Sequence, residues 1–109
     1  MSTPPPGPIA LCAGSDCAKD RRKDFRRLRA GLDGCDVVMT KCMGVCHGPV
    51  AVLGAQTDRP VVIERIRSGK QVKAIRRLAD HGGDVPRRLQ QVTKPKKLRE
   101  AITRARTAA

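Results

Sequence analysis

The chain has 109 residues and a mass of 11.8 kDa, which fits one domain and excludes two domains that each bury a substantial core. Trp and Tyr are absent and Phe25 is the single aromatic residue, so aliphatic side chains and cysteines have to form the core. The formal net charge of +13 favours an acidic partner, which is nucleic acid, an anionic membrane surface or an acidic protein surface.

The positive charge is concentrated in the second half of the chain. Residues 61–109 carry 14 Lys and Arg against 4 Asp and Glu, whereas residues 1–60 carry 9 against 6. No apolar run approaches the ~20 residues that span a bilayer, and the Pro-rich leader 1–7 lacks the hydrophobic segment of a secretory signal. We therefore expect a flexible leader, a cytoplasmic location and no contact with membranes.

The first predicted elements are a strand and a helix. Residues 8–11 form an apolar run that ends at Cys12, followed by small polar residues typical of a loop. The stretch 17–32 places apolar residues at helical spacing among basic ones, namely Phe25, Leu28 and Leu32. Ser15 or Asp16 is expected to cap this helix, and Gly31 or Gly34 to end it.

Three strands are predicted next. Residues 36–40 are short and β-branched, and the apolar runs 50–53 and 60–66 flank a turn-rich segment. The last two strands are therefore expected to form a hairpin.

The second predicted helix begins at Ser68, which together with Gln71 forms the Ser-x-x-Gln pattern of a capping box. Apolar residues then recur at helical spacing up to Gly82 and Gly83. Beyond this point residues 84–109 carry eight basic residues and a weak helical pattern, so they are interpreted as a basic C-terminal extension of a domain formed by residues 8–83. The resulting order predicts an α/β domain with a small four-stranded mixed sheet and helices packed on it.

Four of the five cysteines form two close pairs. Cys12 and Cys17 are separated by four residues, Cys42 and Cys46 by three, and 24 residues lie between the pairs. Both pairs fall in predicted loops at strand ends, so adjacent strands would bring them to one edge of the sheet. Thiolates in such pairs suit an iron–sulfur cluster or, as the alternative, zinc. Cys35 has no close partner and is expected to be an inert, partly buried thiol.

The residues around the second pair could support a metal centre. Gly44 and Gly48 permit positive φ values that aim backbone N–H groups at bound sulfur, and His47 is a loop residue that could donate a hydrogen bond to sulfur.

The first cysteine pair has the form Cys12-x4-Cys17, and the second lies in the motif Cys42-Met-Gly-Val-Cys46-His-Gly-Pro, which leads into an apolar strand. This pattern resembles the thioredoxin-like [2Fe-2S] ferredoxins, a family that includes the small cluster-bearing subunit of respiratory NADH dehydrogenase. The resemblance covers roughly residues 8–83. It implies a thioredoxin-like fold, one [2Fe-2S] cluster ligated by Cys12, Cys17, Cys42 and Cys46, and pairing into homodimers. The short stretch between the pairs favours a stand-alone carrier or a regulatory member over a subunit of a larger dehydrogenase.

Two functions follow as hypotheses. The first is a one-electron carrier that docks on an acidic redox partner protein and is not itself an enzyme; thiol–disulfide exchange is disfavoured because no Cys-x-x-Cys pair occurs. The alternative is a structural or sensor module, with zinc or a cluster bound by cysteines, that holds nucleic acid nonspecifically through residues 84–109. Sequence-specific RNA recognition is disfavoured by the lack of stacking aromatic residues.

Overall fold

The computed structural model describes residues 8–13, 21–41, 48–57, 59–82 and 84–108. Five strands and three helices follow one another along this part of the chain: β1 (Ile9–Cys12), α1 (Arg22–Gly31), β2 (Val37–Thr40), β3 (Ala51–Leu53), β4 (Val61–Glu64), α2 (Gly69–His81), β5 (Gln90–Gln91) and α3 (Pro95–Ala108). The predicted α/β class is confirmed, and the leader 1–7 lies outside the described residues.

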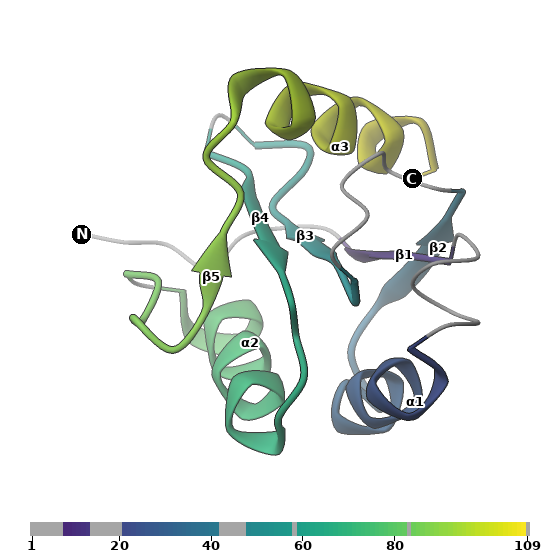
Figure 1. The fold of residues 1–109 in the computed structure, drawn as a ribbon, viewed down its shortest axis with the longest axis vertical. Helices are drawn as coiled ribbons and strands as arrows, with labels where there is room; N and C mark the ends of the chain where they lie inside the picture. Colours follow the sequence, from purple (N-terminus) through teal and green to yellow (C-terminus); the bar gives the residue numbers. More distant parts are fainter. Residues whose placement is uncertain (1–7, 14–20, 42–47, 58, 83, 109) are drawn as a thin grey trace.

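The strands form one mixed sheet in the order β2-β1-β3-β4-β5 (Figure 1). β1 and β2 are parallel, and the other neighbours are antiparallel, including the predicted hairpin β3–β4. The sheet has five strands, one more than the four that were predicted. The fifth strand, β5, escaped prediction because it is two exposed glutamines that join the sheet through the backbone, opposite Ile63 and Glu64.

The helices lie on both faces of the sheet. Figure 1 shows α1 and α2 on one face and α3 on the other. The alternation of β1 divides its side chains accordingly, because successive residues of a strand point to opposite faces. Ile9 and Leu11 belong to the core cluster that α1 and α2 cover, whereas Ala10 and Cys12 belong to the cluster that α3 covers.

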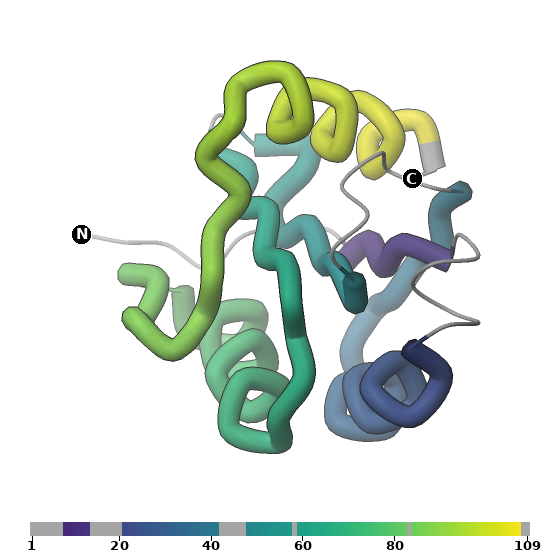
Figure 2. Tube along the Cα trace, in the orientation of Figure 1, coloured from purple at the N-terminus to yellow at the C-terminus, as the bar shows by residue number. Residues whose placement is uncertain are grey.

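Helix α3 is the main difference from the sequence-based picture of a basic extension. Its small residues Ala101 and Ala105 are fully buried, and they pack with Val52 and Val62 of the sheet. In Figure 2 this C-terminal helix, coloured yellow, lies across the sheet from α1 and α2. Residues 84–109 therefore include a helix that packs on one face of the sheet. Most of its basic side chains are exposed, while Arg106 donates hydrogen bonds to the carbonyls of Ala55 and Thr57.

Local signals place the helix ends. The Ser68–Gln71 capping box is confirmed: Ser68 Oγ accepts a hydrogen bond from the Gln71 N–H, and the Gln71 side chain accepts one from the Ser68 N–H. Gly82, with a φ of +69°, caps α2 as expected. Helix α1 ends at Gly31, one of the two glycines predicted to end it. It begins at Arg22 with Arg21 as its N-cap, so the prediction that Ser15 or Asp16 caps this helix was wrong.

Strand β4 ends two residues before its predicted end, since Arg65 adopts a φ of +54° and leaves the sheet. The next N–H, of Ile66, donates a hydrogen bond of 3.2 Å to the Pro49 carbonyl. The Gly48–Pro49 peptide bond is cis, and both residues are buried. The end of β4 thus holds the segment through which the chain returns from residues 42–47 to β3.

Candidate metal centre

Cys12 is the last residue of β1 and lies directly beside Thr40, the last residue of β2. Since the two strands are parallel, both carboxyl ends lie at one edge of the sheet. The segments that carry Cys17 and Cys42 follow these two ends in the sequence. The predicted adjacency of the two strands is therefore confirmed, and with it the shared starting point of the two loops.

Backbone hydrogen bonds tie three chain segments together at Cys12. The Ala13 N–H donates to the Thr40 carbonyl at 2.9 Å, which continues the β1–β2 pairing past the strand ends. The Cys12 N–H donates to the Val50 carbonyl at 3.1 Å. Val50 follows the Gly48–Pro49 bond, so the residues on either side of the segment that carries Cys42 and Cys46 are both hydrogen-bonded next to Cys12.

The side chain of Cys12 is buried, with 2% of the residue exposed, on the face of the sheet that α3 covers. Its Sγ lies 3.9 Å from the carbonyl oxygen of Lys41. The Thr40 hydroxyl donates a hydrogen bond of 2.8 Å to this same oxygen. Cys12 therefore offers a buried sulfur where two cysteine-bearing segments begin. Such a sulfur suits a soft metal ion or an iron–sulfur cluster, which prefer thiolate ligands and a site protected from water.

Of the seven predicted site residues, two belong to the part of the chain that the structure describes and five do not. Cys12 and Gly48 are described, and Gly48 is buried beside Pro49. Five candidates lie outside the described residues: Cys17, Cys42, Gly44, Cys46 and His47. Within the described ranges, no group of three or more His, Cys, Asp or Glu side chains is placed to hold a metal ion.

Cys35 lies at the other end of the sheet. It precedes β2, its N–H donates to the Leu32 carbonyl at 2.9 Å, and its side chain packs, partly buried, against the cluster under α1 and α2. The fifth cysteine is thus partly buried as expected, and it is separated from Cys12 by the length of β2.

Sequence reasoning missed that α3 covers the face to which the Cys12 side chain belongs. The signal was present in the helical spacing of Leu98, Ile102 and Ala105, which was assigned to a weak helix in the extension. In the structure these residues pack against Ala10, Cys12 and Val52 in one cluster.

Comparison with known proteins found no matching family model, no matching curated protein and no matching solved structure. In the part of the chain that the structure describes, no helix is both long and apolar enough to cross a bilayer.

Proposed function

We propose that the protein binds one [2Fe-2S] cluster through Cys12, Cys17, Cys42 and Cys46 and acts as a ferredoxin-like one-electron carrier. The observation that carries this proposal is the pairing of Cys12 with Thr40 at the carboxyl ends of two adjacent parallel strands. Because of this pairing, the segments that carry Cys17, Cys42 and Cys46 begin at the same edge of the sheet.

Chain connectivity strengthens this argument. Cys42 follows Thr40 by two residues, and a chain advances at most about 3.6 Å per residue. Cys46 precedes Val50 by four residues, and the Val50 carbonyl is hydrogen-bonded to the Cys12 N–H. Both cysteines of the second pair are therefore tethered at short range to residues that contact Cys12.

The arrangement of elements supports a thioredoxin-like domain. A β-α-β unit with parallel strands is followed by an antiparallel hairpin and a helix, with β1 between β2 and β3. This is the arrangement that the resemblance of the cysteine motifs implies for residues 8–83.

A bound [2Fe-2S] cluster supplies reversible uptake of a single electron. The chain would contribute ligands, exclusion of water and a charged surface. Cys12 lies in a buried, apolar environment, and the hydrogen bond from Thr40 holds the Lys41 carbonyl beside its sulfur. The net charge of +13 favours docking on an acidic redox partner, since complementary charge accelerates association between electron-transfer proteins.

The test is anaerobic analysis of iron, acid-labile sulfide and zinc in the full-length protein, with visible spectra before and after dithionite. We expect about two irons and two sulfides per chain and a colour that bleaches on reduction. Cys12→Ala should lose the cluster, because it removes a ligand, while Cys35→Ala should retain it. Circular dichroism of both variants separates loss of the cluster from loss of the fold.

A colourless protein with one zinc, or a Cys12→Ala variant that keeps full iron and sulfide, would contradict the carrier. The first result would favour the alternative module that holds nucleic acid through residues 84–109. Its affinity for duplex DNA should then fall steeply with added salt.

A further inference from the structure

A cavity of about 390 Å³ lies between α2 and the segment that leads from α2 to β5. Its basic lining residues are Lys70, Lys73 and Arg77 on α2 and Arg88 on the segment, and Asp84 is its one carboxylate among the described residues. Lys70, Lys73 and Arg77 recur at helical spacing, so they share one side of α2. In the described part of the chain, no carboxylate lies within 4.0 Å of any of these four basic groups.

The wall opposite α2 is held in place by two contacts with the rest of the domain. The Gln71 side-chain amide donates a hydrogen bond of 3.0 Å to the Arg88 carbonyl. The next residue, Leu89, is buried in the core under α1 and α2, and its N–H donates to the Pro86 carbonyl at 3.0 Å. The backbone at Arg88 is therefore fixed, while its guanidinium group is left to line the cavity.

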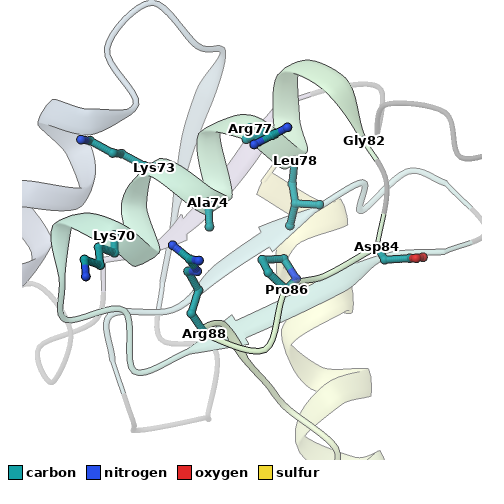
Figure 3. Close-up of a pocket in the computed structure, with 9 residues that line it drawn as sticks. All are labelled: Lys70, Lys73, Ala74, Arg77, Leu78, Gly82, Asp84, Pro86 and Arg88. Atoms are coloured by element: carbon teal, nitrogen blue, oxygen red, sulfur yellow. The ribbon is translucent and has the colours of Figure 1, made fainter.

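The chemistry of the cavity differs along its length. Figure 3 shows Lys70 and Arg88 at one end, Leu78 and Pro86 facing each other in the middle with Arg77 beside Leu78 on α2, and Asp84 at the other end. Ala74 adds to the apolar surface between the ends. A ligand that fits this arrangement is anionic at one end, apolar in its body, and not anionic at the far end, where Asp84 would repel a second negative charge.

We propose that this cavity binds a small organic phosphate whose body is the size of a ring system, such as a nucleoside monophosphate. Lys70 and Arg88 would bind the phosphate, as Lys and Arg do through charge-assisted hydrogen bonds. The apolar middle would bind the ring, and the Asp84 carboxylate would accept a hydrogen bond from an N–H or O–H group of the ligand. The volume lies within the ~300–1,000 Å³ range of small-molecule sites and is too small to enclose a polynucleotide.

The site is independent of the candidate metal centre. The segment 84–88 leads into β5, which is the edge strand opposite β2, and β3 and β4 lie between β5 and β1. Ligand binding can therefore be measured whatever the metal content of the protein, and its failure would leave the proposed electron carrier untouched.

The experiment is calorimetric titration of the full-length protein with adenosine monophosphate, adenosine and inorganic phosphate at 0.15 M salt. We expect the monophosphate to bind at least about tenfold more tightly than either fragment, because only it contacts both the basic end and the apolar middle. Arg88→Ala should weaken its binding by about tenfold, since a charge-assisted hydrogen bond is lost. The backbone hydrogen bond from Gln71 to residue 88 does not depend on the side chain, so this variant should fold normally.

Arg99→Ala is the matched control, because Arg99 is an exposed arginine of α3, on the opposite face of the sheet. It should leave the affinity unchanged. The proposal is overturned if inorganic phosphate binds as tightly as the monophosphate, if Arg99→Ala weakens binding as much as Arg88→Ala, or if no heat of binding is measured. It is equally overturned if short duplex DNA binds more tightly than the monophosphate and loses that affinity in Arg88→Ala, since the basic residues would then serve a polynucleotide.

Discussion

At Gly31 two helices approach too closely for any larger residue. A Cβ atom at this position would collide with Cγ1 of Val72, a buried residue in the first turn of α2. Val72 has little freedom to move away, because a β-branched side chain in a helix has one strongly preferred rotamer. Gly31 therefore sets the distance between α1 and α2, which together cover one face of the sheet.

We expect Gly31→Ala to lower the free energy of unfolding by about 1–3 kcal/mol, the usual range for an overpacked core. This loss outweighs the gain in helix propensity of up to about 1 kcal/mol. Gly69→Ala is the matched control: a Cβ there meets no atom within 4 Å, so the same substitution should be neutral or stabilising. Urea unfolding of both variants checks the prediction, and equal stabilities would contradict it.

At the scale of a single element, α2 depends on its capping box. The Gln71 side-chain oxygen accepts hydrogen bonds from two backbone N–H groups, of Arg67 at 2.7 Å and of Ser68 at 3.0 Å. The Ser68 hydroxyl oxygen accepts one from the Gln71 N–H at 3.2 Å. These bonds satisfy backbone groups that a helix start would otherwise leave without partners in the protein.

Ser68→Ala should destabilise the protein by about 1 kcal/mol, because it removes the acceptor for the Gln71 N–H. Ser68→Asp should keep most of the stability, since a carboxylate accepts the same hydrogen bond and interacts favourably with the helix dipole. Thermal unfolding monitored by circular dichroism measures both. If Ser68→Asp proves as unstable as Ser68→Ala, the cap does not contribute in this way.

A second element-scale feature is the link between α1 and α2 through Arg76. Its Nη1 donates hydrogen bonds to the carbonyls of Gly31, at 3.2 Å, and Asp33, at 2.8 Å, which lie at the end of α1. A cation near the carboxyl end of a helix is also favoured by the helix dipole. Arg76 is therefore engaged in contacts within the domain, whereas Lys70 and Arg88 are the residues proposed to bind a phosphate.

At the scale of the whole molecule, α3 closes the second face of the sheet. Ala101 and Ala105 are fully buried against sheet residues that include Val52 and Val62. Removing the helix to test nucleic-acid binding would uncover this apolar face and destabilise the fold. Substitution of the exposed basic residues of α3 is therefore the appropriate test of that function.

The packing of α3 can be tested by two substitutions to the same residue. Ala101→Leu should lower the free energy of unfolding by about 1–3 kcal/mol, because the larger side chain does not fit against the sheet. Thr103→Leu, on the exposed side of the same helix, should change it by no more than about 0.5 kcal/mol. Denaturant unfolding of the two variants measures the difference, and a tolerated Ala101→Leu would show that α3 does not pack as described.

Features of the fold that rest on local patterns could be predicted from the sequence alone. The continuous apolar run of β1, the spacing of Phe25 and Leu28 in α1 and the Ser68–Gln71 capping box all depend on neighbours within a turn or a strand, so they could be predicted. The cysteine spacing likewise identified the candidate ligands, and the structure then placed Cys12 at the strand edge from which the other segments start.

Contacts between segments that are distant in the chain could not be predicted and became known from the fold. The fifth strand at Gln90–Gln91 has no pattern of its own and exists because β4 offers it backbone partners. The approach of Gly31 to Val72 and the cavity between α2 and Arg88 join residues far apart in the chain. Such contacts depend on how faces pack and on which polar groups find partners there, which no local periodicity encodes.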